Sequence, residues 1–359
     1  YMRLATLRKA HDIIANAIDQ YMRLATLRKA HDIIANAISQ LPIFPHYTFD
    51  LNDLLYGAVD GQQFEMTTPT SKARHSRKQF GKGRGVSAYT LLCNHVPLQC
   101  ELNDPHEHES YFLFDVWYNN KTLIRPTIVT SDMHGINKAN FCVLYWFGAE
   151  LRPRFTNLKT ELKHVFCGKS LAVYEKFLVQ PAGQINPQLI NREQENIGKI
   201  VTSLALKENS QSNLIKKLCH LPATNKIRQA VYEFDRLVRS IYTLNCILHP
   251  EILDNAHRSQ NRVESYHNLR ASIARAGGEK ALLGRTDLEV EINNQINRLL
   301  GTAVIYYNSV ILSELLEKNV PEKKKKKFMK KVKKSSPVAW RHVHFTGHFV
   351  FYGNKKTIS

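Results

Sequence analysis

AVDGQQFE (residues 58–65) and IVTSDMHG (residues 128–135) are the two stretches that decide the fold of this chain. In each of them a short apolar run leads to an aspartate, Asp60 or Asp132, and a small or polar turn follows. Such runs are typical of β-strands, so we expect two carboxylates at strand ends. A third acid, Glu264, lies far downstream in the helix-like stretch NRVESYHNLR. Carboxylates arranged in this way can converge on two divalent cations, which activate water and stabilise the oxygens of a phosphoryl displacement.

Each acid also has an ordinary explanation, because aspartate before glycine is common in turns and a glutamate on a helix usually faces solvent. The charge of the whole chain favours a shared site. There are 50 Lys and Arg against 31 Asp and Glu, which gives a net charge of +19 and a pI near 9.6. A chain with this charge is expected to bind a nucleic-acid backbone, with a membrane surface as the rival partner.

Length and composition indicate a protein with a sizeable core. The 359 residues are enough for one large domain or two modest ones, and 43% of them are hydrophobic. No apolar run approaches the length of about 18 residues that a spanning helix needs, and no secretory signal is recognisable. The six cysteines are scattered without a CxxC pair. We therefore expect a cytoplasmic protein with buried free thiols rather than a disulfide framework or a zinc site.

The N-terminal segment is a duplication. Residues 1–20 recur almost unchanged as residues 21–40, with Asp19 replaced by Ser39. Twenty residues at about 100° each leave about 200° beyond whole turns, so one continuous helix would point its two apolar stripes in nearly opposite directions. Only one copy can then dock on the core, and we expect it to be the second. The near-identity is typical of a recent duplication or of an artefact of gene assembly, and a fragment of a longer protein is expected.

The order of the expected elements indicates an α/β fold. The pattern predicts three strands of antiparallel type, then a helix, a strand and a helix. These cover residues 58–67, then 86–102 with a turn near Asn94 and His95, and then 109–119, 127–131 and 137–147. This is the order of a ribonuclease-H-like mixed sheet flanked by helices. Residues 72–85 are expected to form a basic loop punctuated by glycines.

The rest of the chain is expected to be mainly helical. Residues 174–256 have helical periodicity, and they make the gap from Asp132 to Glu264 nearly twice the gap from Asp60 to Asp132. A large helical insertion before the Glu264 helix explains this spacing. A mobile loop (277–284) and a long amphipathic helix (287–317) follow. The expected division is 1–40, 41–168, 169–256, 257–320, a lysine-rich linker at 321–335, and a tail at 336–359. The lysines are expected to be either a solvated, disordered linker or a grip on phosphates.

Four stretches of this sequence, in this order, are distinctive: DGQQFE (60–65) and residues 73–99, 103–120 and 130–154. They resemble the catalytic region of transposases of the Tn-three family. A weaker resemblance continues through VESYHNLRASI (263–273) and YYNSVILSEL (306–315) to WRHVHFTGHFVF (340–351). The resemblance implies a DDE transposase in which Asp60, Asp132 and Glu264 hold two Mg²⁺ ions, with Mn²⁺ as a possible substitute. Water would nick the transposon 3′ ends, and the freed 3′-hydroxyl would attack target DNA in the same site.

The resemblance also implies replicative transposition on double-stranded DNA, a homodimer that pairs two inverted-repeat ends, and a separate resolvase that acts downstream. It implies a nucleoid-associated protein of the bacterial cytoplasm with no membrane partner. Family members are much longer, so this chain is expected to be truncated at its N-terminus. Two alternatives stay open: a ribonuclease-H-like nuclease that cuts without joining, and an inactive DNA-binding remnant.

Basic side chains near the acids are candidates for contacts with DNA phosphates, which give affinity and salt dependence but little sequence information. The candidates are Arg74, His75, Arg77, Lys78, Lys82, Arg84, Arg152, Arg154 and Arg262. A surface hairpin with solvated charges is the alternative for the first six.

Two histidines are candidates for supporting the acids. His134 could touch a metal-bound water or the scissile phosphate, or have a structural role, and His267 shares the helix face of Glu264. The run His106, Glu107, His108, Glu109 could bind zinc on an extended strand. We do not expect zinc, because the segment that follows reads as a helix and its acids suit the first helical turn.

Overall fold

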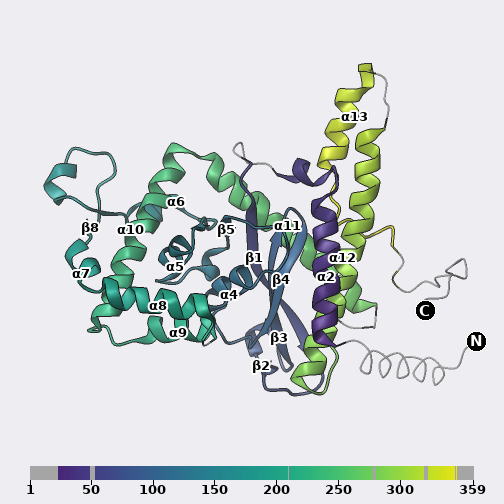
Figure 1. The fold of residues 1–359 in the computed structure, drawn as a ribbon, viewed down its shortest axis with the longest axis horizontal. Helices are drawn as coiled ribbons and strands as arrows, with labels where there is room; N and C mark the ends of the chain where they lie inside the picture. Colours follow the sequence, from purple (N-terminus) through teal and green to yellow (C-terminus); the bar gives the residue numbers. More distant parts are fainter. Residues whose placement is uncertain are drawn as a thin grey trace, which may run out of the picture.

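The computed structural model describes residues 23–48, 53–208, 210–276, 278, 280–318, 322–343 and 345. The first copy of the repeat and the end of the C-terminal tail lie outside these residues. The fold is mixed α/β, with one curled sheet between two groups of helices (Figure 1). The division of the chain into six segments stays a prediction.

The sheet combines an antiparallel half with a parallel half. Its strands are β1 (Tyr56–Met66), β2 (Arg74–His75), β3 (Arg84–Cys93), β4 (Val96–Asn103), β5 (Ile128–Thr130) and β6 (Glu150–Leu151). β3 pairs antiparallel with β1, and β4 and β2 both pair antiparallel with β3. β5 pairs parallel with the other side of β1, and β6 pairs parallel with β5. The predicted order of three antiparallel strands, helix, strand and helix is confirmed.

The β3–β4 hairpin turns where the sequence predicts. Asn94 and His95 join the strands with φ of 46° and 70°. Two positive φ values in a two-residue loop match the right-handed twist of the flanking strands. The loop predicted for residues 72–85 contains more structure than expected, since it includes β2, the short helix α3 (Arg77–Phe80) and the start of β3.

One face of the sheet is covered by α4 (Leu113–Tyr118) and α5 (Asn140–Trp146). The single helix predicted for residues 109–119 is split into the 3-10 helix η2 (Glu109–Tyr111) and α4. Side chains alternate between the faces of a strand, so Val59 and Leu91, which are partners on β1 and β3, join the core beside Leu113.

The other face is covered by α11 (Glu251–Arg275), α12 (Asp287–Glu317) and α2 (Leu24–Ser39) (Figure 1). α2 is the second copy of the repeat, so the prediction that this copy docks is confirmed. α12 has the predicted bounds and begins with a capping box, in which Thr286 and Glu289 satisfy each other's backbone N–H groups. The short 3-10 helix η1 (Phe44–Tyr47) follows α2.

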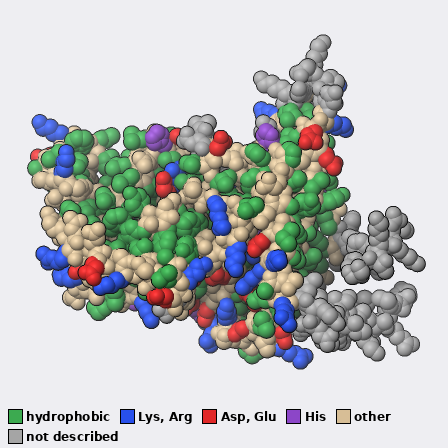
Figure 2. Space-filling view, viewed as in Figure 1, with side chains coloured by type: hydrophobic (Ala, Val, Ile, Leu, Met, Phe, Trp, Pro, Cys, Tyr) green, Lys and Arg blue, Asp and Glu red, His purple; other side chains and the backbone are tan. Residues whose placement is uncertain are grey.

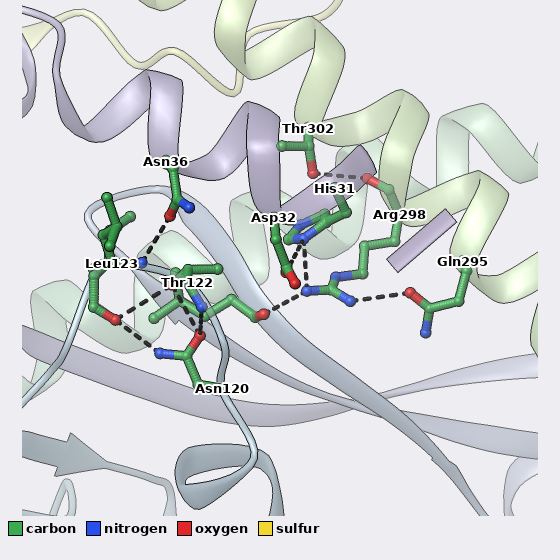
Figure 3. A network of polar contacts seen from close by, with 11 residues as sticks. His31, Asp32, Asn36, Asn120, Thr122, Leu123, Gln295, Arg298 and Thr302 are labelled. Atoms are coloured by element: carbon green, nitrogen blue, oxygen red, sulfur yellow. Dashed lines mark hydrogen bonds and ion pairs between the residues drawn. The ribbon is translucent and has the colours of Figure 1, made fainter. Parts of the chain in front are cut away.

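A buried polar network joins α2, α12 and β4 (Figure 3). Arg298 is fully buried and donates to Gln295 Oε1 (3.0 Å), to His31 Nδ1 (2.9 Å) and to the carbonyl of Leu98. Burial and the neighbouring guanidinium lower the pKa of His31 to about 4, so this ring is neutral and can accept the bond. These contacts set the position of α2 on α12.

By length and composition alone, α12 could cross a membrane, and it is the one such helix among the described residues. Its polar side chains argue for a different role. Asn294 and Arg298 are buried inside the protein and hydrogen-bonded there. One such helix is weak evidence for a membrane span, because the core helix of a soluble protein passes the same length and composition test.

The expected helical stretch is present. It follows α6 (Leu158–Leu162), β7 (Phe166–Cys167) and η4 (Leu171–Tyr174), and it contains β8 (Gly183–Gln184), α7 (Pro187–Arg192), α8 (Gln194–Leu206), α9 (Gln211–His220) and α10 (Lys226–Leu248). β7 and β8 pair in a small parallel ribbon. The Asp235 carboxylate of α10 accepts hydrogen bonds from Phe141 N (3.0 Å) and Cys142 N (3.2 Å). These N–H groups lie in the first turn of α5 and have no partner within that helix. The two hydrogen bonds therefore hold α10 against α5, which lies on the sheet.

Three further predictions can be compared with the structure. The lysine-rich segment forms helix α13 (Glu322–Lys334) rather than a disordered linker. Within the predicted mobile loop, Gly277 and Glu279 lie outside the described residues. The part after them is anchored, because Glu65 N donates to the Lys280 carbonyl (3.4 Å) and Leu282 N donates to the Glu65 carbonyl (3.1 Å). All six cysteines are free thiols, as expected.

Candidate active site

Asp60 and Asp132 lie side by side because of the register between β1 and β5. Ala58 pairs with Thr130 in this parallel pair, so the residues two positions further along each strand are level with each other. The sequence predicted Asp60 at the end of a strand. In the structure Asp60 lies in the middle of β1, because the pairing of β1 with β3 continues to Met66. It lies where the pairing with β5 stops and one edge of β1 becomes free.

Asp132 is held by the turn that follows β5. Its Oδ1 atom accepts hydrogen bonds from His134 N (2.9 Å) and Gly135 N (3.2 Å), which caps the 3-10 helix η3 (Met133–Gly135). The two bonds fix the orientation of the carboxylate relative to the sheet. The His134 side chain itself is exposed at the surface beside this turn.

Helix α11 brings Glu264 and His267 to the same place. The helix packs on β1, where the Gln62 side chain donates to the His267 carbonyl (2.6 Å). His267 Nδ1 lies 3.7 Å from Asp60 Oδ2. Burial, followed by the charges of Arg270 and Lys280, lowers the pKa of His267 to about 3, so the ring is neutral beside the aspartate. Glu264 lies one turn earlier and is exposed.

The electrostatics of Asp60 show that the acids share one region. Burial, followed by the charges of Glu109, Asp132 and Glu264, raises its pKa to about 7, against the lowering effect of a hydrogen bond from Gly61 N (2.9 Å). The structure thus brings together the three acids that the sequence singles out, and it adds a fourth.

Glu109 is an acid of this region that the sequence placed either in a zinc-binding run with residues 106–108 or in the first turn of a helix, and not beside Asp60. Its Oε1 atom accepts a hydrogen bond from Ser87 Oγ (2.9 Å) on β3. Its carboxylate lies against Gly61, the residue after Asp60. The sequence shows a glutamate that starts a helix after an antiparallel hairpin, and this pattern does not reveal the approach to Gly61.

The chemistry of these side chains fits a divalent cation. Four carboxylates supply the hard oxygen ligands that Mg²⁺ and Mn²⁺ prefer. Within the described parts of the chain, the Lys and Arg ion pairs go to other acids and not to these four. No three His, Cys, Asp or Glu side chains of the described residues form a ready ligand set. The donors are therefore of the right type and in one region, but not closed into a cage.

The side chains of residues 106–109 have different partners from one another. His106 Nε2 bonds to the His75 carbonyl (2.7 Å), and Glu107 pairs with Lys216. His108 Nδ1 bonds to Ser110 Oγ (2.7 Å). The four side chains diverge and do not surround a common point.

Six of the basic candidates are exposed around β2, α3 and the start of β3: Arg74, His75, Arg77, Lys78, Lys82 and Arg84. Because Arg84 pairs with Met66, this basic hairpin lies beyond Asp60 along β1. Figure 2 shows Lys and Arg side chains, with some acids between them, over the lower end of the sheet where β2 and β3 lie. Arg74 is partly neutralised by Asp104, at 3.3 Å.

The other three basic candidates differ from one another. Arg154 is next to the site, since its N–H donates to the Ser131 carbonyl (2.8 Å). Arg152 pairs with Glu150 (2.8 Å) and donates to Tyr56 Oη (2.9 Å).

Arg262 points into the protein. It donates to the Tyr47 carbonyl (2.6 Å) and to Asn94 Oδ1 (3.2 Å), and burial lowers its pKa to about 10. It joins α11 to the β3–β4 turn, which gives this side chain a structural role in place of the predicted DNA contact.

Comparison with known proteins now gives the family. The Tn3 transposase DDE domain matches residues 1–349. The chain belongs to this family. It is 21% identical over 300 residues to the transposase for transposon Tn501 of Pseudomonas aeruginosa, which covers 83% of this chain and 30% of that protein. It is 23% identical over 307 residues to the transposase for transposon Tn2501 of Escherichia coli, with the same two shares.

Membership in the Tn3 transposase DDE family rests on sequence, because no solved structure matches this chain. The chain spans about 30% of the length of the curated relatives it matches. Activities of those whole proteins therefore do not transfer directly to this chain.

Proposed function

We propose that this chain is the catalytic domain of a DDE transposase, which nicks transposon 3′ ends and joins them to target DNA. The observation that carries the proposal is the meeting of Asp60, Asp132 and Glu264. They come from β1, from the turn after β5 and from α11, and each adds negative charge to one small region. A family match over nearly the whole chain supports the same conclusion.

The fold we propose is ribonuclease-H-like. Support comes from the sheet, in which three antiparallel strands are continued on one side by two strands parallel to the first. Support also comes from the positions of the acids, on the first strand, just after the first parallel neighbour, and on a later helix. The long helical segment between Asp132 and Glu264 is then an insertion into this fold.

Asp60, Asp132 and Glu264 are the residues that would hold two Mg²⁺ ions, or Mn²⁺ in their place. Such a pair, when bound, supplies an activated water and stabilises the charge of both reacting oxygens. The protein's part is to aim the carboxylates. Neutral His267 lies against Asp60 without pairing its charge, and two backbone N–H groups orient Asp132. The burial of Asp60 keeps the site partly dry, which strengthens its electrostatics.

DNA would lie along the basic hairpin and past Arg154. Exposed Arg74, His75, Arg77, Lys78, Lys82 and Arg84 would neutralise phosphates, with Arg152 partly occupied by Glu150. His134 is exposed beside Asp132 and could contact the scissile phosphate or its water. A homodimer that pairs two transposon ends, a separate resolvase, and a nucleoid location in the cytoplasm belong to the same proposal.

The test is a nicking and strand-transfer assay with pre-cleaved transposon ends and Mg²⁺ or Mn²⁺. It compares the chain with its Asp60→Asn, Asp132→Asn and Glu264→Gln variants. Glu195→Gln is the matched control, because this acid is exposed and pairs only with Lys199 on α8. We expect joined products from the chain and the control, and a loss of at least about 10²-fold in the three site variants, as is typical when one stabilising group is removed.

The other outcomes of this assay are informative. Cutting that depends on the three acids but gives no joined product indicates a nuclease with the same site. DNA binding without any metal-dependent chemistry indicates an inactive remnant. Activity that survives all three substitutions would contradict the proposed site.

A further inference from the structure

We propose that Glu109 is a fourth carboxylate of the acid site, a ligand to the same divalent cations as Asp60 and Asp132, and that Gly61 is a glycine in order to admit it. This inference rests on the proposed function and deepens it. The three acids of the proposed DDE site are Asp60, Asp132 and Glu264, so Glu109 is an addition to it.

The alternation of β1 places Glu109 and α11 on opposite sides of Asp60. Gln62, which has the same parity as Asp60, donates to the His267 carbonyl of α11. Gly61 faces the other way and pairs with Tyr89 on β3. Glu109 approaches from this second face and accepts a hydrogen bond from Ser87 Oγ (2.9 Å). Glu264 and Glu109 therefore approach β1 from its two faces, at the position of Asp60 where the pairing with β5 has ended, and the charges of both act on Asp60.

Gly61 leaves the room that Glu109 occupies. A Cβ atom at this position would lie 2.8 Å from Glu109 Oε2 and closer still to Oε1. Real Cβ atoms do not approach other atoms so closely, so any other residue would displace the carboxylate. In β1 a glycine costs stability relative to residues that pack well in strands, and the close approach of the Glu109 carboxylate gives a reason for it.

A role for Glu109 only in the first turn of a helix does not explain its contacts. The cap of η2 is already supplied by His108, whose Nδ1 atom accepts from Ser110 N (3.4 Å). The Glu109 side chain turns away to β3. There it lies half-buried, and its negative charge acts on Asp60. A glutamine could keep the Ser87 contact, so this hydrogen bond alone does not require a carboxylate, whereas a hard oxygen ligand to a divalent cation does favour one.

A buried hydroxyl also points into this region. Tyr89 is 1% exposed, and its hydroxyl has no hydrogen-bond partner within the described chain. The charges acting on it are those of Glu109, Asp60 and Asp132. An unsatisfied buried polar group is unfavourable unless a ligand or water completes it. Its place among three carboxylates fits the hydration shell of a bound cation.

The test is Mn²⁺ binding to the whole chain, measured from the electron paramagnetic resonance signal of free Mn²⁺, with and without a short DNA duplex. It compares the chain with Glu109→Gln, Gly61→Ala, Asp60→Asn and Glu107→Gln. Glu107→Gln is the matched control, because this acid is in the same loop but pairs with Lys216. We expect Glu109→Gln and Gly61→Ala to weaken Mn²⁺ binding about 10- to 100-fold, the range seen when groups around a metal are removed. The control should be unchanged.

The arms separate this inference from the proposed function. If Asp60→Asn loses Mn²⁺ while Glu109→Gln binds it like the unsubstituted chain, Glu109 is structural and the inference is overturned, but the function stands. If the unsubstituted chain binds no Mn²⁺, or Asp60→Asn binds it normally, both fail. Circular dichroism of each variant checks folding. If Gly61→Ala distorts β1, Glu109→Gln still tests the inference, because glutamine has the shape of glutamate and can keep the hydrogen bond from Ser87.

Discussion

At the scale of single residues, the candidate site is a place where the protein holds like charges together. Asp60 is the best example, because burial and three neighbouring acids raise its pKa to about 7. In the unfolded chain its pKa is the ordinary value of about 3.9. The folded state therefore binds the proton of the Asp60 carboxyl more tightly than the unfolded chain does. Protonation of Asp60 stabilises the folded state.

A dependence of stability on pH follows from this shift. As pH rises from about 4 to 7, the folded protein without divalent cation should lose stability, by at most about 1.4 kcal/mol per pH unit from this one group. Urea unfolding at several pH values measures it. The Asp60→Asn variant should lack this part of the pH dependence. Equal slopes in the variant and the unsubstituted chain would show that Asp60 does not have the raised pKa.

At the scale of elements, the second repeat copy is held by its inward face. On α2, Ile38 is fully buried, whereas Ile33 is 60% exposed. Ile38→Ala should lower the free energy of unfolding by about 2–5 kcal/mol, because it removes core contacts and leaves a cavity. Ile33→Ala, the same change on the same helix, should stay within about 0.5 kcal/mol. Chemical denaturation of both variants measures the difference, and equal effects would mean that α2 is not docked as described.

The elements also show what could be predicted from sequence. β1, the β3–β4 hairpin and α12 were predictable, because alternation, the turn at Asn94 and the cap at Thr286 are local signals. The approach of Glu109 to Gly61 was not, since it joins two elements through tertiary packing.

Arg262 was misleading for a related reason. It was a candidate because it lies two residues before Glu264 in the sequence, but the Tyr47 carbonyl of η1 and the Asn94 side chain, which bind it, come from distant segments.

At the scale of the whole molecule, a net charge of +19 has two possible uses: binding DNA or only keeping the chain soluble. The arrangement favours the first, because six basic candidates are exposed on one hairpin along β1. Arg270 and Arg298 are buried, and half-buried Arg262 donates to the Tyr47 carbonyl inside the protein. The salt dependence of DNA binding can distinguish exposed arginines that contact phosphates from arginines that bind inside the protein.

Binding to a DNA duplex should weaken as salt rises, and each lost phosphate contact should reduce the slope of log K against log salt by about 0.9. We expect this reduction for Arg77→Gln and for Lys78→Gln, whose side chains are exposed on α3. Arg262→Gln should leave the slope unchanged and instead lower the free energy of unfolding, because it leaves the Tyr47 carbonyl without its donor. Fluorescence anisotropy over a salt series, with denaturation of each variant, measures both. A reduced slope in Arg262→Gln alone would return this residue to the DNA surface and place the duplex on α11 instead of the hairpin.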